Sequence, residues 1–210
     1  MGDSEIKSYL LDTNGFRYLT NPKEDKGIKK AANTFWRQAS EEIQNGKAIL
    51  VIPKEVAREL EVQSFSLPGG EKQYVRIAEL LEEVEETLPD ISTPEIEHQI
   101  RKISAYIGEE FREVIKADLD ITKVKYGSVS DIRIFYSAWQ YDCVLVTGNV
   151  KDFILYPLLF SHEEDRLFDI ITGTYKKYAR TSYLAITNDP VFLGMMQDLQ
   201  RIIEKAENEV

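Results

Sequence analysis

The chain has 210 residues, 43% of them hydrophobic, which suits one soluble globular domain with a sizeable core. No apolar run approaches the roughly 20 residues of a membrane span, and residues 1–7 lack the basic and then apolar order of a signal peptide, so we expect a cytoplasmic protein outside any membrane. The net charge of −10 disfavours a nucleic-acid partner, but residues 71–120 alone carry 14 acidic and 6 basic side chains, which leaves the remainder close to neutral.

Short apolar runs predict buried strands, and apolar residues at helical spacing predict the helices between them. In chain order the expected elements are strand 8–11, helix 28–45, strand 48–52, helix 53–63, helix 71–88, helix 95–116, a helix that begins at Ser130, strand 143–147, strand 167–171, strand 181–187 and helix 190–206. Breaks are expected at residues 67–70 and 89–94, so that the middle segment forms a charged helical hairpin.

Strands that alternate with helices predict an α/β fold with a parallel central sheet covered on both faces. We expect one domain over residues 1–210. Ligands of such sheets collect at the carboxyl ends of the strands. Asp12 follows the first expected strand, and Asn149 and Asp152 follow the third, so these side chains are expected at one edge of the sheet.

The carboxylates expected at this edge are Asp12, Glu59, Asp131 and Asp152. Taken alone, each aspartate can cap a helix, and the glutamate can be a solvated helical side chain. Together they would repel one another unless a cation lay between them, and oxygen ligands suit Mg²⁺ or Mn²⁺. One such ion would polarise an attacking water and a second would stabilise a leaving oxygen, which predicts hydrolysis of a phosphodiester.

Four segments carry these acids, and they are YLLDTN (residues 9–14), VIPKEVARELE (residues 51–61), SDIRIFYSAW (residues 130–139) and VLVTGNVKDF (residues 144–153). In sequence and in order they resemble the motifs of PIN domains. The resemblance covers roughly residues 8–63 and 128–172, and its specificity comes from the order of the motifs. It implies a three-layer α/β/α PIN-like fold in which residues 64–127 are a helical insertion and residues 173–210 are a C-terminal extension.

The resemblance places the family's metal-binding and catalytic acids at Asp12, Glu59, Asp131 and Asp152. It places the supporting polar residues at Asn14, Thr147 and Asn149. Glu55 lies one turn before Glu59 and nearer the strand end, so it stays an alternative, although Glu59 has the family's position before a leucine. Basic residues beside the acids are candidates for binding substrate phosphates, and they are Arg58, Arg133 and Lys151.

PIN domains commonly cleave RNA, so the resemblance implies an endoribonuclease that uses Mg²⁺ or Mn²⁺. Many small prokaryotic members are toxins paired with an antitoxin, which implies a toxin–antitoxin role and an antitoxin protein as a partner. The insertion and the extension are the segments that could cover the cleft, bind a partner or form a homodimer. The resemblance leaves open whether one or two metal ions bind.

Other functions are weighed against this one. A PIN-like module that binds RNA or protein without cleaving it is the main alternative. A Mg²⁺-dependent phosphatase would need a second acid two residues after Asp12, where the chain has Asn14, and no glycine-rich phosphate loop with a lysine is present. The single cysteine, Cys143, and two distant histidines argue against a thiolate zinc cluster and a Ser-His-Asp triad.

Overall fold

The structure is a computed structural model that describes residues 6–66 and 70–208. Within these residues the centre is a six-stranded sheet in the order β3-β2-β1-β4-β5-β6. The strands are β1 (Lys7–Leu11), β2 (Ala48–Pro53), β3 (Glu86–Leu88), β4 (Val144–Thr147), β5 (Leu167–Asp169) and β6 (Thr174–Tyr175). The first five in chain order run parallel and β6 is antiparallel, so the expected parallel sheet is confirmed with one antiparallel edge strand.

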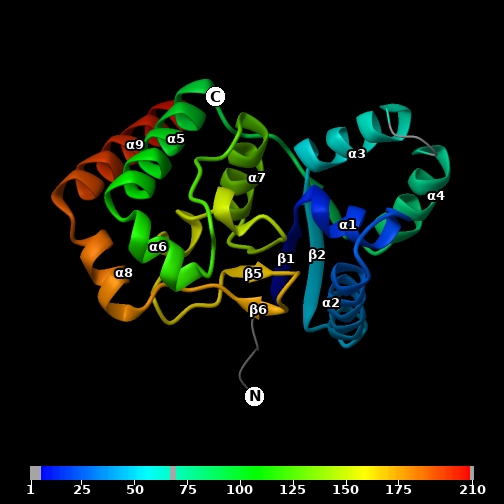
Figure 1. Cartoon of the computed structure of the whole chain (residues 1–210). Helices are drawn as coiled ribbons and strands as arrows, with labels where there is room; N and C mark the ends of the chain where they lie inside the picture. Colours follow the sequence, from blue (N-terminus) through cyan, green and yellow to red (C-terminus); the bar gives the residue numbers. More distant parts are fainter. Residues whose placement is uncertain (1–5, 67–69, 209–210) are drawn as a thin grey trace, which may run out of the picture.

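Helices cover both faces of this sheet. Figure 1 shows α1 to α4 on one side and α5 to α9 on the other. The helices are α1 (Thr13–Thr20), α2 (Lys26–Gln44), α3 (Lys54–Ser66), α4 (Gly70–Leu81), α5 (Pro94–Glu110), α6 (Arg112–Leu119), α7 (Val129–Gln140), α8 (Arg180–Thr187) and α9 (Pro190–Asn208). The predicted three-layer α/β/α class is therefore confirmed.

The central strands are apolar along their length because helices pack on both of their faces. Leu10, Leu50 and Leu145 are fully buried, and Leu10 pairs in register with Val51 on one side and Leu145 on the other. This register aligns the ends of β1 and β4, and the Asp12 backbone N–H donates to the Val146 carbonyl at 3.1 Å. The residues that follow the strands therefore emerge at one edge.

The charged helical hairpin that was predicted for the middle segment is wrong. The helix expected over residues 71–88 ends at Leu81, and residues 86–88 form β3 beside β2. Val84 and Leu88 fit helical spacing equally well, so the pattern could not reveal the strand. Helix α4 packs against α3 and α1, whereas α5 packs against α9 and α7, on the opposite side of the molecule in Figure 1.

Smaller differences concern single elements. Residues 181–187 were expected to be a strand but belong to α8, and the backbone N–H of Tyr183 donates to the Ala179 carbonyl as in a helix. Pro53 is the last residue of β2 rather than the first of the following helix. The helix expected over residues 95–116 is interrupted at Phe111, between α5 and α6. The break predicted at residues 67–70 falls largely outside the described residues.

The C-terminal helix α9 is part of the folded core. Its Leu199 and Ile203 side chains are buried, and the Gln99 side chain of α5 donates to the Met195 carbonyl of α9 at 2.9 Å. None of the helices in the described part of the chain is long and apolar enough to cross a membrane.

Candidate acidic site at the carboxyl edge of the sheet

Asp12 lies at the junction of β1 and α1. It is the N-cap of α1, and its carboxylate accepts hydrogen bonds from the backbone N–H groups of Asn14 at 2.9 Å and Gly15 at 3.2 Å. The Asn14 side-chain amide at 3.3 Å and the Thr147 hydroxyl at 2.5 Å donate to its other oxygen. Asp12 is only 3% exposed, and these hydrogen bonds fix the orientation of its carboxylate. The predicted supporting residues Asn14 and Thr147 therefore contact Asp12 directly.

Burial raises the pKa of Asp12 to about 6, although hydrogen bonds from Thr147, Gly15 and Asn14 act in the opposite direction. Loss of water around the charged form outweighs the donated hydrogen bonds. A positive charge beside this carboxylate would therefore relieve a penalty that the fold itself imposes.

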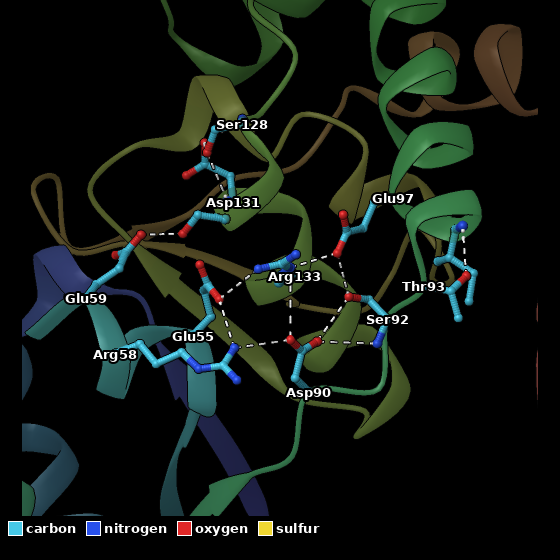
Figure 2. Close-up of polar contacts among 12 residues, drawn as sticks. Glu55, Arg58, Glu59, Asp90, Ser92, Thr93, Glu97, Ser128, Asp131 and Arg133 are labelled. Carbon is cyan, nitrogen blue, oxygen red and sulfur yellow. Dashed lines mark hydrogen bonds and ion pairs between the residues drawn. The ribbon is translucent and has the colours of Figure 1, made fainter. Parts of the chain in front are cut away.

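Glu59 lies on α3 and reaches both neighbouring helices. Its carboxylate accepts hydrogen bonds from the hydroxyl of Thr13, the residue after Asp12, and from the hydroxyl of Ser130, the residue before Asp131. Figure 2 shows Glu59 directed towards the start of α7. Glu59 thus connects the segments that carry two of the other predicted acids.

Glu55, the alternative to Glu59, is engaged elsewhere. Its carboxylate forms ion pairs with Arg133 at 3.3 Å and with Arg58 at 3.6 Å, and Figure 2 shows it turned towards these two guanidinium groups. Two arginines already compensate its charge, whereas described partners of Glu59 are hydroxyl groups. The geometry therefore favours Glu59 as the acid available to a cation.

Asp131 is held at the start of α7 by a capping box with Ser128. The Ser128 backbone N–H and hydroxyl both donate to one Asp131 oxygen at 2.7 Å, and the Asp131 backbone N–H donates to the Ser128 hydroxyl. The second carboxylate oxygen accepts no hydrogen bond from the described residues. Sequence reasoning missed Ser128, although the spacing of serine and aspartate three residues apart is the usual mark of such a cap.

Asp152 ends a short 3-10 turn, residues 150–152, that follows β4. It accepts a hydrogen bond from the side-chain amide of Asn149, whose oxygen in turn accepts from Lys151 at 2.5 Å. The pKa of Asp152 is raised, first by burial and then by the charge of Asp131. The predicted neighbours Asn149 and Lys151 therefore surround Asp152, and Asp131 is close enough to affect it.

Two cavities adjoin these side chains. The first, of about 570 Å³, is lined by residues that include Asp12, Asn14, Glu59, Asp131 and Asn149. Asp152 lines the neighbouring cavity, which shares Asp131 with the first. The structure thus brings three of the four predicted acids to one cavity and places the fourth beside it, across Asp131.

The donor set fits Mg²⁺ or Mn²⁺ in chemical type, because carboxylate, amide and hydroxyl oxygens are hard ligands. Within the described residues, however, no group of three acidic, histidine or cysteine side chains is close enough to hold an ion. Mg²⁺ usually keeps several waters and needs only one or two carboxylates. Asp12 and Asp131 meet that smaller requirement. Burial raises the pKa of Asp12, and Ser128 donates hydrogen bonds to one oxygen of Asp131 and not to the other.

The predicted phosphate-binding residues have different surroundings. Arg58 lines the first cavity and is half exposed, with Asp90 at 3.4 Å. Arg133 is not among the residues that line that cavity, and Figure 2 shows its guanidinium among acidic side chains, paired with Glu97 at 2.7 Å. Arg17, which sequence reasoning did not single out, also lines the first cavity, and its buried Nε has no hydrogen-bond partner among the described residues. Arg17 and Arg58 are therefore the better-placed cations.

No family model matches the chain, and no curated protein matches its sequence significantly. Among solved structures, the chain is similar to VapBC2 from Rickettsia felis bound to a DNA fragment from their promoter, with a TM-score of 0.43, 22% identity and coverage of 70% of this chain and 90% of that one.

It is also similar to FitAcB from Neisseria gonorrhoeae, with a TM-score of 0.44, 18% identity and coverage of 70% and 91%. VapBC-1 from nontypeable Haemophilus influenzae gives a TM-score of 0.40 at 22% identity, with coverage of 70% and 90%. Similarities of this size assign neither a family nor a function to the chain.

Proposed function

We propose that the chain is a divalent-metal-dependent nuclease that hydrolyses phosphodiester bonds of RNA. One observation carries the proposal: Asp12, Glu59 and Asp131 come from three separate elements and line a single cavity at the carboxyl edge of the sheet. Ligand sites of open α/β sheets lie at this edge. The ordered motifs that resemble PIN domains support the same assignment.

In this proposal Asp12 and Asp131 hold the metal, and Glu59 and Asp152 complete its surroundings. When bound, a divalent cation supplies charge neutralisation for the phosphodiester and lowers the pKa of the attacking water. Thr147 and Asn14 orient the Asp12 carboxylate through their hydrogen bonds, and Ser128 orients Asp131. These contacts fix the acids before substrate arrives, which is the condition for efficient electrostatic catalysis.

The basic side chains of the first cavity bind the substrate backbone. Arg17 of α1 and Arg58 of α3 line the same cavity as Asp131 and present guanidinium groups suited to phosphate. The resemblance to PIN domains is the basis for proposing RNA as the substrate. It is also the basis for proposing a toxin role, an antitoxin partner and a homodimer.

A binding module without nuclease activity is the second candidate. It is favoured by one observation: each of the four acids already accepts a hydrogen bond from a protein group, and no three acidic, histidine or cysteine side chains of the described residues lie close enough together to hold a metal ion. Such a protein would bind RNA or a protein partner at the same edge without cleaving a substrate.

Cleavage of single-stranded RNA by the purified protein in Mg²⁺ or Mn²⁺ tests the proposal. Asp12→Asn and Asp131→Asn should each lower the rate by roughly 100-fold or more, because loss of electrostatic stabilisation at a reacting centre costs about that much. Asp198→Asn, on the exposed face of α9, is the matched control and should keep full activity. Equal activity in all variants would remove the assigned site, and RNA binding without cleavage by the wild type would favour the second candidate.

A further inference from the structure

The second cavity lies on the other side of Asp131, between α5 and the segment of residues 121–128. Its volume is about 680 Å³, and its walls include Asp131 and Asp152. We call it the Tyr126 cavity, after the aromatic residue of its lining. It opens beside the proposed nuclease site but takes most of its lining from residues 101–128, which none of the four motifs covers.

Tyr126 and Arg101 form an aromatic and cationic pair in the wall of the Tyr126 cavity. The Tyr126 side chain is 54% exposed, and the Arg101 guanidinium lies 5.3 Å from the centre of its ring. The Arg101 Nε is buried and has no hydrogen-bond partner among the described residues. A solvent-facing ring beside a guanidinium with unused donor capacity is a combination that binds a base by stacking and a phosphate by charge.

Both acidic and basic side chains line the Tyr126 cavity. Arg112 is paired with Glu109 on the rim, so these two charges compensate each other. Arg101 and Lys125 line the same cavity as Asp131 and Asp152. With a cation at the acids, the cavity would be positive, although it is built partly from the acidic segment of the chain.

Two glycines allow the segment of residues 121–128 to pack closely against its surroundings. A Cβ on Gly108 of α5 would meet the Val124 side chain at 2.8 Å. A Cβ on Gly127 would meet the Asp131 Cβ at 2.9 Å and the Asp152 carbonyl oxygen at 3.3 Å. Because side chains at these positions would push the segment away, the glycines let Tyr126 stand directly beside the proposed nuclease site.

We propose that the Tyr126 cavity binds an unpaired nucleotide of the single-stranded RNA that enters the acidic site, with the base stacked on Tyr126 and the adjacent phosphate bound by Arg101 and Lys125. The inference rests on the proposed function. Bases in a duplex are stacked on one another and cannot reach such a ring, so the cavity selects single strands.

Fluorescence anisotropy with a short labelled single-stranded RNA of mixed sequence tests this inference. The full chain carries Asp12→Asn so that the RNA stays intact. Adding Tyr126→Ala should weaken binding about 10-fold, because a base loses its stacking partner. The matched control is Tyr141→Ala, another exposed tyrosine, at the end of α7. Arg101→Gln should weaken binding similarly and lower the slope of affinity against salt by about 0.7, while the exposed Arg201→Gln should change neither.

The outcomes separate this inference from the proposed function. If wild-type protein cleaves RNA while Tyr126→Ala and Arg101→Gln bind like their controls, the inference is overturned and the nuclease stands. If the two cavity variants lose binding but wild-type protein cleaves nothing, the nuclease fails and the inference is supported. A duplex of the same sequence that binds as tightly, or RNA that does not bind at all, would also overturn the inference.

Discussion

The surroundings of Asp12 have opposite effects on the charge of its carboxylate. As the N-cap of α1 it accepts backbone hydrogen bonds that favour its charged form, while its burial in the sheet edge disfavours the same charge. Burial prevails, since the pKa of Asp12 rises to about 6. A cation beside the Asp12 carboxylate would therefore stabilise its charged form.

The pH dependence of stability should reveal this cost. The pKa of Asp12 is about 6 in the folded chain against an ordinary 3.8, so the folded state binds the proton more tightly. Its contribution to stability is therefore fully present below pH 4 and is lost as the pH rises through 6, by about 3 kcal/mol. Asp12→Asn lacks this titration, and its amide oxygen can still accept the two backbone hydrogen bonds.

Urea unfolding of both proteins between pH 4 and 8, with EDTA present, measures the difference. The wild type should lose free energy of unfolding relative to Asp12→Asn as the pH rises. A difference that is independent of pH would contradict the assigned shift. Asp152 titrates in both proteins, so its contribution to the free energy of unfolding cancels in the comparison.

Helices α3 and α7 carry Glu59 and Asp131, and an ion-pair network ties them to the start of α5. Figure 2 shows Arg133 of α7 at its centre. Its guanidinium lies 2.7 Å from Glu97, 3.3 Å from Glu55 and 3.9 Å from Asp90. The hydrogen bonds that Arg133 donates to Glu97 and Glu55 raise its pKa further, so the arginine is charged at any accessible pH.

Arg133→Met should destabilise the protein by about 2 kcal/mol. The Glu97 and Glu55 side chains are 9% and 13% exposed, and removing the arginine leaves these acids poorly compensated. Arg58→Met removes an arginine of the same network that is 49% exposed, so solvent replaces its contacts and the cost should stay below about 1 kcal/mol. Urea unfolding at pH 7 measures both, and equal costs would show that Arg133 has no special position.

On the scale of the whole molecule, the chain from residue 173 onward belongs to the same core as the sheet. The Tyr106 hydroxyl of α5 donates to Asp189, just before α9, at 2.8 Å, and α9 buries Phe192, Leu199 and Ile203. These contacts connect α9 to α5, which packs on α7 beside the acidic site. The folded chain should therefore unfold as one cooperative unit.

Leu199→Ala tests that cooperativity. The side chain is fully buried, so its truncation should cost about 2 to 5 kcal/mol, whereas Leu193→Ala on the exposed face of α9 should cost little. Thermal unfolding is followed by far-ultraviolet circular dichroism and, in a Trp139→Phe background that removes the second tryptophan, by fluorescence of Trp36, which packs on Phe16 of α1. Both signals should shift together; two separate transitions, with only one displaced, would show that α9 unfolds independently.

Short-range patterns of the sequence were enough to predict several features. Continuous apolar runs predicted β1, β2 and β4, because strands buried on both faces have no polar alternation. Asp12 and Asp131 were recognised at strand and helix ends; in the structure Asp12 is the N-cap of α1, and Asp131 completes the capping box of Ser128 at the start of α7. Their roles as metal ligands stay a prediction that awaits the cleavage assay.

The remaining features depend on residues far apart in the chain. Residues 86–88 become a strand only because β2 offers them backbone partners, and α4 and α5 separate because each finds a better apolar surface elsewhere. Glu55 and Glu59 share the same helical pattern, but Arg133 pairs with the former while Thr13 and Ser130 contact the latter. Sequence alone determined the fold class, which follows from local periodicity, and the candidate acids, which follow from their places at strand and helix ends and from the resemblance to PIN domains. Tertiary structure decided which acids face the cavity, since that depends on contacts between distant segments.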